Sequence, residues 1–356
     1  AARELRRPGV LEAAAAAVLL AACAAGPPAP ATLDTANDTC GQPKRISLEA
    51  EMDCPGHRPL HYRLELEARG QGYGIPLEVL SQEHEGRYAG PFKHIDSHDT
   101  DVRYYRFEGE DKPRLVRPEW DHNPLETTLS QVPKMFKEPE ELRRTLSSVT
   151  QYHVLDVGPR APVKLPQQMK PVLLPGADGE DLVPFLYNLR ESSGDRYDPI
   201  EDTLRSAFPG FENLNFPAAA AGMLSLTWKE RQFKEPIYAH QLSEGILRFL
   251  WLISLLQSPN LSTVTMIDEP EVSLHPELLS LLADLLREAC QRTQLIVATH
   301  SDRLIRFLEP KEVMVMDLAE DGCATATWAD TMDLDEWLKE YSLDEVWRMG
   351  RMGGRS

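Results

Sequence analysis

The chain has 356 residues, of which 42% are hydrophobic and 26% charged, a mixture typical of a globular protein with a sizeable buried core. Its formal net charge of −18 disfavours a protein coated with a basic nucleic-acid-binding surface, although a small local basic groove would still fit. The five cysteines form no Cys-x-x-Cys pair, and an odd number scattered along the chain suits a reducing cytoplasm better than a disulfide framework.

The first 45 residues predict an Ala-rich remnant followed by a loop. Residues 10–25 are rich in alanine and leucine and follow three arginines, and residues 20–23 resemble a lipoprotein cleavage box, so a secreted lipoprotein is one interpretation. The run contains Glu12 and is too short to span a bilayer as a mature helix. We therefore favour an Ala-rich helix ahead of a loop rich in proline and polar residues, and we expect no membrane partner.

Residues 46–118 predict an antiparallel β subdomain. Apolar and polar side chains alternate with period two over residues 46–52 and 60–68, and weaker repeats follow at 75–80 and 102–107. Alternation interrupted by turn residues is typical of half-exposed antiparallel strands. We expect these strands to form a β-meander.

Residues 119–225 predict a helical and connecting segment. The sequence favours helices at residues 138–149, 178–189 and 199–208. It also favours an extended proline-rich connection at 159–175 and a short strand at 222–229.

Residues 226–318 predict a lobe built on a parallel sheet, and residues 319–356 a C-terminal tail. Short β-rich runs alternate with helical patterns, the runs at 263–267, 294–298 and 313–316 and the helices at 276–290 and 302–308. Apolar strands separated by helices belong to parallel sheets that are covered on both faces.

An acidic pair, Asp268 and Glu269, directly follows the first of these strands. Ligands of open parallel sheets bind beyond the carboxyl ends of the strands, and two carboxylates there can hold Mg²⁺ and polarise a water for phosphoryl transfer. The same dipeptide at 335–336 and 344–345 has no apolar strand before it, and we interpret those copies as solvated helix surface.

Two further features accompany the acidic pair. The next strand ends in Thr299-His300-Ser301, which places His300 beside the pair, where it could hydrogen-bond a terminal phosphate; the alternative is an ordinary strand-end histidine. Ser243 stands as an N-cap before an apolar helix expected at 246–256. The free N–H groups of a helix start attract anions, although a plainly capped helix would have the same sequence.

Together these features resemble the ABC-type ATPases of the RecF and SMC class, and most closely the bacterial AAA-family ATPases with an AAA_21-type core. Residues 242–250, Leu-Ser-Glu-Gly-Ile-Leu-Arg-Phe-Leu, resemble the signature motif; residues 264–276 resemble Walker B followed by the D-loop; and residues 298–301 resemble the switch-histidine segment. The resemblance implies an α/β fold, the ABC-type head of the P-loop NTPases, in which a parallel sheet flanked by helices is joined to an antiparallel β-meander and a helical segment.

The resemblance also implies roles for individual residues. Asp268 would complete the Mg²⁺ shell, Glu269 would be the general base for the attacking water, and His300 would contact the γ-phosphate of ATP. The remaining residues would contact a second head, which holds its own ATP. Ser243, Glu244 and Gly245 would bind the nucleotide of that second head. Ser273 and His275 would lie at the head–head interface. Two heads would enclose two nucleotides, so dimerisation would depend on ATP.

The sequence contains no P-loop string of the form G-x-x-x-x-G-K-[ST]. Gly41-Gln42-Pro43-Lys44 lacks the second glycine and the hydroxyl, and its proline would remove an N–H donor. Since the P-loop of relatives precedes the first meander strands and this sequence has no initiator Met, we expect an N-terminally truncated chain that binds and hydrolyses ATP poorly alone. The alternative is a non-catalytic remnant that serves as a protein-interaction module.

The expected partner is a second ATPase head, most simply another copy of this chain. The stretch after Asp317 is too short for an appended nuclease domain, so an effector would be a separately encoded protein. DNA would be compatible with the resemblance but is not indicated by charge, because the tail tryptophans Trp328, Trp337 and Trp347 have acidic surroundings that disfavour a nucleic-acid backbone.

Overall fold

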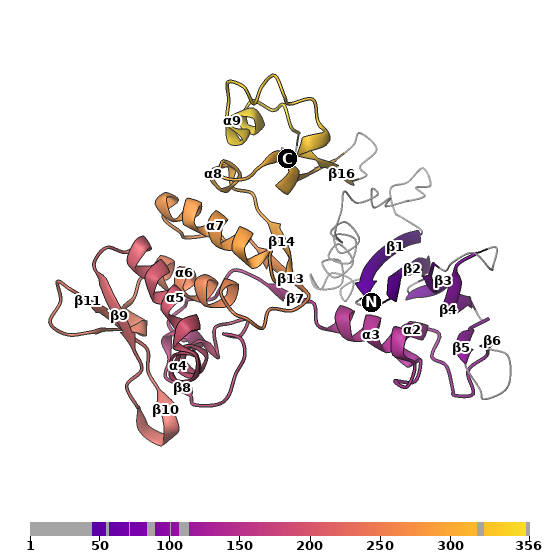
Figure 1. The fold of residues 1–356 in the computed structure, drawn as a ribbon, viewed down its shortest axis with the longest axis horizontal. Coiled ribbons are helices and arrows are strands. Elements are labelled where there is room, and N and C mark those ends of the chain that lie inside the picture. The colour runs from indigo at the N-terminus through magenta and orange to yellow at the C-terminus, as the bar shows by residue number, and fades with distance from the viewer. Residues whose placement is uncertain are drawn as a thin grey trace. The chain divides into compact units, whose positions relative to one another are not determined.

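The computed structural model describes residues 45–54, 57–70, 72–83, 90–99, 101–106, 114–318 and 324–353 (Figure 1). The expectations for residues 1–44, including the Ala-rich run, the cleavage-box resemblance at 20–23 and the string at 41–44, lie outside the described residues. Within the described ranges, no helix combines the length and the apolar character that crossing a bilayer requires. The chain divides after Ser148 into two compact units, so the division falls inside the segment 119–225 that the sequence presents as continuous.

The first unit contains a six-stranded antiparallel sheet in which each strand pairs with the next one along the chain. The strands are β1 (Arg45–Cys54), β2 (His57–Arg69), β3 (Gly72–Gln82), β4 (Phe92–His98), β5 (Tyr104–Arg106) and β6 (Arg114–Val116). Leu60, Leu80 and Ile95 from neighbouring strands form a core with Leu142 of α3 (Lys137–Ser147). The β-meander inferred from alternation is therefore confirmed.

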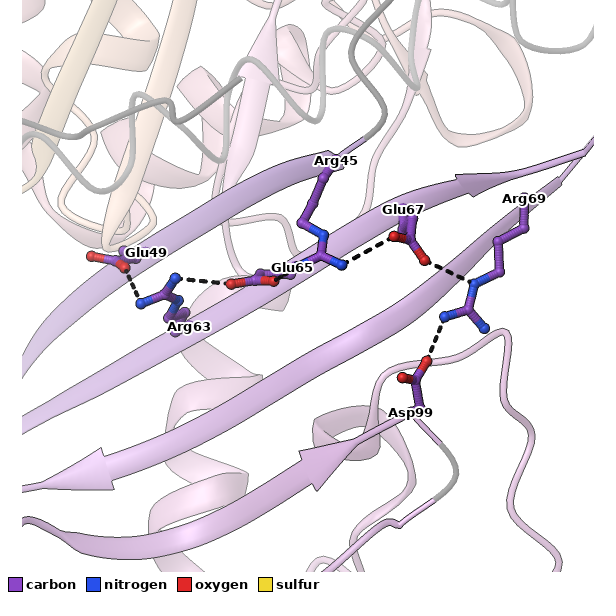
Figure 2. A network of polar contacts seen from close by, with 7 residues as sticks. All are labelled: Arg45, Glu49, Arg63, Glu65, Glu67, Arg69 and Asp99. Atoms are coloured by element: carbon purple, nitrogen blue, oxygen red, sulfur yellow. Dashed lines mark hydrogen bonds and ion pairs between the residues drawn. The ribbon is translucent and has the colours of Figure 1, made fainter. Parts of the chain in front are cut away.

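The polar side chains of the first unit form a ladder of ion pairs along β1 and β2 (Figure 2). Arg45 bridges Glu65 at 3.1 Å and Glu67 at 3.0 Å. Arg63 similarly bridges Glu65 at 2.8 Å and Glu49 at 3.4 Å. The arginines and Glu49 are about half-exposed, whereas Glu65 is buried. Pairs exposed to solvent each contribute about 0–1 kcal/mol. The ladder therefore supports strand register and leaves little uncompensated charge along its length.

A buried carboxylate, Glu78 of β3, joins the sheet to the short helix α2 (Thr128–Gln131). It accepts hydrogen bonds from the Tyr62 hydroxyl at 2.9 Å and from the Leu129 N–H at 2.8 Å. Burial raises the pKa of Glu78 and raises the pKa of Tyr62 well above its usual value. The carboxylate thus receives the free N–H groups of a helix start, which would otherwise be buried without partners.

Replacing Tyr62 with phenylalanine should destabilise the first unit by about 1 kcal/mol, because one hydrogen bond to a buried carboxylate is lost. The raised pKa of Glu78 means that the folded state holds its proton more tightly than the unfolded chain. Stability should therefore fall as pH rises from the usual glutamate range through the raised value, and more steeply in the variant. Urea unfolding at several pH values measures this. Tyr73→Phe is the control, because it removes an exposed hydrogen bond of 2.8 Å to the Leu125 carbonyl and should cost less. Equal stability of Tyr62→Phe and wild type would contradict the expectation.

The second unit is organised around a three-stranded parallel sheet of order β14–β13–β7. The strands are β7 (Thr150–Tyr152), β13 (Val264–Asp268) and β14 (Gln294–Ala298). Ile267 of β13 shares one hydrophobic core with helices α6 (Glu244–Leu256) and α7 (Leu279–Ala289), which lie beside the strands in Figure 1. This confirms the predicted α/β fold class of a parallel sheet flanked by helices, joined to the β-meander.

A network of hydroxyl groups fixes the register of the three parallel strands. Ser262, just before β13, lies 2.7 Å from the Thr150 hydroxyl of β7 and 3.1 Å from that of Thr265. Thr265 in turn lies 3.2 Å from the Thr293 hydroxyl, directly before β14. Because Thr265 is fully buried, these bonds satisfy polar groups that could not reach water. The strand starts are held together, so their carboxyl ends also meet at one edge.

The third strand expected in this sheet is wrong. The run at 313–316 belongs to β15 (Met314–Leu318), which pairs antiparallel with β16 (Ala324–Trp328). Its Met316 side chain is 50% exposed, whereas β13 is buried at four of its five positions. A two-stranded hairpin that faces solvent on one side needs only half of its side chains buried, which explains why an apolar run alone did not reveal its pairing.

The helices and short strands between β7 and α6 complete the second unit. They are α4 (Leu182–Ser192), α5 (Gly194–Ala207), β8 (Gln167–Gln168) paired with β10 (Met223–Leu224), and β9 (Phe211–Asn215), β11 (Thr227–Glu230) and β12 (Ile237–Tyr238) in one small antiparallel sheet. The helix expected from Pro199 begins five residues earlier, at Gly194, so Pro199 lies inside the helix. Trp228 of β11 is fully buried in the common core.

The tail packs on its own small core around Val315 and Val346, with helix α9 (Leu343–Arg348) covering it. Trp337 and Trp347 pack against this core, in line with a packing role. The expectation that the acidic pair at 344–345 is solvated surface is wrong for Asp344, which is only 3% exposed. Its carboxylate is bound by Arg348 and by the hydroxyl of Ser342, the capping residue of α9, because a buried acid needs such partners.

Candidate functional site

The acidic pair lies at the carboxyl end of β13, the central strand of the parallel sheet. Asp268 is the last residue of the strand and pairs in register with Ala298 of β14. The N–H of Glu269 then donates to the Ala298 carbonyl at 2.8 Å. His300 follows Ala298 by two residues and is exposed. The structure therefore places the two carboxylates and His300 at adjacent strand ends on one edge of the sheet.

A second histidine joins the acidic pair from the other side. His153 directly follows β7, and its Nδ1 lies 3.5 Å from Oδ2 of Asp268. His153 could not be predicted from the sequence, because β7 has only three residues and no apolar run. The one available signal, a threonine and a tyrosine in a short stretch of high β propensity, does not reveal which strand it pairs with.

A shallow pocket opens beside the acidic pair. His153, Asp268 and Glu269 contribute polar groups to its wall, and Trp251 of α6 contributes an apolar ring. Arg248, also on α6, brings a guanidinium group to the same pocket. Among the described residues, neither carboxylate of the acidic pair forms an ion pair with lysine or arginine. Both remain available to a cation.

The turn that follows the acidic pair, residues 269–275, is here called the D-loop turn. Its Glu269 and Ser273 have positive φ angles of 46° and 63°, a backbone region that residues other than glycine rarely occupy and that clusters at functional sites. Glu271 in the turn accepts a hydrogen bond of 2.5 Å from the Thr299 hydroxyl. The turn is therefore tied to the end of β14 next to His300.

Residues 242–245, here called the signature turn, lead into α6. Ser243 caps the helix by accepting the N–H of Ile246 at 3.3 Å, and both Ser243 and Glu244 are exposed. A Cβ atom on Gly245 would lie 2.7 Å from the carbonyl oxygen of Ser273. Only glycine permits this approach, which brings the signature turn against the D-loop turn. His275, the last residue of the D-loop turn, is exposed. Its Nδ1 accepts the N–H of Glu277 at 3.4 Å.

Residues 62–306 match the family described as "AAA domain, putative AbiEii toxin, Type IV TA system". The chain belongs to this AAA-domain family. The match spans the meander from β2 onward, the acidic pair, the signature turn and His300, so every candidate residue lies inside the AAA domain. The family consists of ATPases, and an ATPase core is thereby shown.

Solved structures similar to the AAA domain include heads of SMC ATPases. One, from a study of ATP-driven dimerisation and DNA-stimulated activation of SMC ATPases, is 14% identical, with 47% of this chain and 97% of that chain covered and a TM-score of 0.34. An SMC head bound to the C-terminal winged-helix domain of ScpA is 12% identical, with 75% and 74% covered and a TM-score of 0.37. The SMC head of Thermotoga maritima is 11% identical, with 75% and 73% covered and a TM-score of 0.34. No curated protein matches the chain.

The carboxylate of Asp268 is a possible ligand for a magnesium ion at the end of β13. Within the described ranges, no group of three or more His, Cys, Asp or Glu side chains could hold a metal. Mg²⁺ in phosphoryl-transfer sites is held by one or two carboxylates, with phosphate oxygens and water completing its shell. Asp268, whose side chain is 43% exposed, can supply one such ligand at the strand end.

Proposed function

We propose that this chain provides the acidic pair and the signature turn of an ATP-hydrolysing head that dimerises when ATP is bound. The observation that supports it best is the convergence of Asp268, Glu269 and His300 at adjacent parallel strand ends, inside an AAA domain. A carboxylate pair at that edge is where a parallel sheet presents groups to a bound phosphate.

Each residue of the site has a distinct task in this proposal. Glu269 accepts a proton from the attacking water at its carboxylate oxygen, and Asp268 provides a ligand for Mg²⁺. His300 donates a hydrogen bond to the terminal phosphate from the neighbouring strand end. When bound, Mg²⁺ would neutralise the charge that develops on the phosphate oxygens. The half-exposed Glu269 needs a partner or substrate to exclude bulk water, since a general base works best in a closed site.

In the proposed dimer, the exposed residues of the signature turn and the D-loop turn form the surface that contacts the second head. Ser243 can donate its hydroxyl hydrogen to a phosphate while its oxygen caps α6. Glu244 would contribute its free backbone N–H and not its carboxylate, which a phosphate would repel. Ser273 and His275 lie in the adjoining turn and would contact the second head. We expect a homodimer in the cytoplasm.

Binding and hydrolysis of ATP require a phosphate-binding loop, and this sequence contains none of the form G-x-x-x-x-G-K-[ST]. We therefore expect this chain alone to show no saturable Mg²⁺-dependent ATP binding at millimolar nucleotide, because the remaining residues position a metal and a water but do not cradle phosphates. Isothermal titration of the chain with Mg²⁺–ATP tests this, and tight binding would contradict it. The same titration on a form that carries a P-loop upstream should show binding and turnover.

The non-catalytic alternative predicts a different outcome of that comparison. If the P-loop-bearing form binds ATP but never hydrolyses it, the acidic pair is not a working active site and the chain is an interaction module. If hydrolysis is present and increases with the square of protein concentration at low concentration, the dimeric ATPase is supported.

A further inference from the structure

Arg248 connects three segments that the sequence separates widely. It lies on α6 one helical turn after Gly245 and is half-buried. Its Nε donates to the Leu155 carbonyl at 3.2 Å, and its Nη1 donates to the hydroxyl of Ser273. Leu155 belongs to the loop after β7, here called the β7 loop (residues 153–157), and Ser273 to the D-loop turn. One guanidinium group therefore holds both segments to α6.

The acceptors of Arg248 are uncharged, although two carboxylates line the same pocket. A planar guanidinium presents its donors in a fixed fork, so it can serve two acceptors in different directions at the same time. A lysine, with a single ammonium group, could not bridge both with the same geometry. The arrangement favours a positioning role for Arg248 over simple charge neutralisation.

Gly245 and Arg248 contact the same residue from the same face of the helix. Positions three apart on a helix lie on one side, and here the backbone of Gly245 meets the Ser273 carbonyl while the Arg248 side chain meets the Ser273 hydroxyl. Ser273 is thus hydrogen-bonded at its side chain, and its backbone lies in close contact with α6. A displacement of α6 would therefore break the bond from Arg248 or open that contact.

The D-loop turn needs such support, because both Glu269 and Ser273 have positive φ angles. Non-glycine residues keep this conformation only when the surrounding structure holds them. The backbone that carries the carboxylate of Glu269 therefore depends on the contacts at Ser273 and on the bond from Glu269 to Ala298.

We propose that Arg248 is a positioning residue that joins the signature turn, the D-loop turn and the β7 loop into one body around Glu269. A second head that docks on Ser243 and Gly245 would then move the acidic pair through Ser273, which couples dimerisation to hydrolysis. This inference rests on the proposed ATPase function for its consequence, but the mechanical link can be measured without ATP.

Hydrogen–deuterium exchange of the full chain tests the link. In Arg248→Ala, peptides that cover the D-loop turn and the β7 loop should both exchange roughly tenfold faster, as expected when each segment loses one charge-assisted hydrogen bond. In Ser273→Ala, only the D-loop turn should exchange faster. Arg248→Lys should protect one of the two segments but not both. Arg292→Ala is the matched control, since Arg292 also donates to a backbone carbonyl of α6, that of Leu256, at 2.5 Å.

Three outcomes would overturn the inference. They are unchanged exchange in Arg248→Ala, equal acceleration of both segments in Ser273→Ala, and the same acceleration in Arg292→Ala. In a P-loop-bearing form, Arg248→Ala should lower kcat about tenfold or more with KM for ATP nearly unchanged, and Lys should restore part of it. A wild-type protein without turnover would contradict the ATPase proposal, while the exchange results would still decide the role of Arg248.

Discussion

Replacing Gly245 with alanine should destabilise the second unit by about 1–3 kcal/mol, which corresponds to a fall in Tm of roughly 2–12 °C for a unit of this size. The new Cβ atom would lie 2.7 Å from the Ser273 carbonyl oxygen, and this oxygen belongs to the backbone, so no flexible side chain can move aside. Either α6 or the D-loop turn must shift. In a P-loop-bearing form, ATP-dependent dimerisation should weaken as well, because both turns lie on the proposed dimer surface.

The matched control is Gly194→Ala. Gly194 is the first residue of α5, has an ordinary φ angle, and has no atom within 4 Å of the added Cβ. Alanine there should be neutral or stabilising by up to about 1 kcal/mol, because it lowers the entropy of the unfolded chain. Thermal unfolding of the two variants and wild type makes the comparison. Wild-type stability of Gly245→Ala would show that the two turns do not need their close contact.

The parts of the fold with regular side-chain patterns could be predicted from the sequence. β1 and β2 alternate apolar and polar residues, and β13 and β14 are short apolar runs between helical patterns, so local periodicity was sufficient. β7 could not be predicted, because three residues carry no periodicity and only their pairing with β13, more than a hundred residues later, makes them a strand. The prediction that the run at 313–316 joins the parallel sheet was wrong for a related reason, because a local pattern does not show which strand a segment pairs with.

The residues of the candidate site also differ in whether the sequence could predict them. Asp268, Glu269 and His300 could be predicted because each follows directly after a recognisable strand, and parallel strands share one edge for their carboxyl ends. His153 could not, since it reaches Asp268 only through the pairing of β7. Arg248 was visible in the sequence only as part of the signature resemblance. Its contacts with Leu155 and Ser273 depend on how α6 packs, which no spacing rule supplies.

Replacing Glu269 with glutamine should lower ATP turnover by about 10²–10⁴-fold in a P-loop-bearing form of the protein, while ATP remains bound. Glutamine keeps the size of the side chain but cannot accept the proton of the attacking water. The effect should appear in kcat and leave ATP affinity nearly unchanged, because Glu269 acts on the water and not on the nucleotide. Glu288→Gln, at an exposed glutamate near the end of α7, is the matched control and should retain full turnover.

The measurement that tests the central claim most directly is single-turnover hydrolysis of pre-bound ATP by the P-loop-bearing form, comparing Glu269→Gln with wild type and with Glu288→Gln. If the acidic pair at the end of β13 is the hydrolytic centre, the Glu269 variant will hold its ATP intact over a period in which the other two convert theirs to ADP. If the Glu269 variant converts its ATP as fast as wild type does, Glu269 is not the general base, and the assignment of the strand-end carboxylates to ATP hydrolysis is wrong.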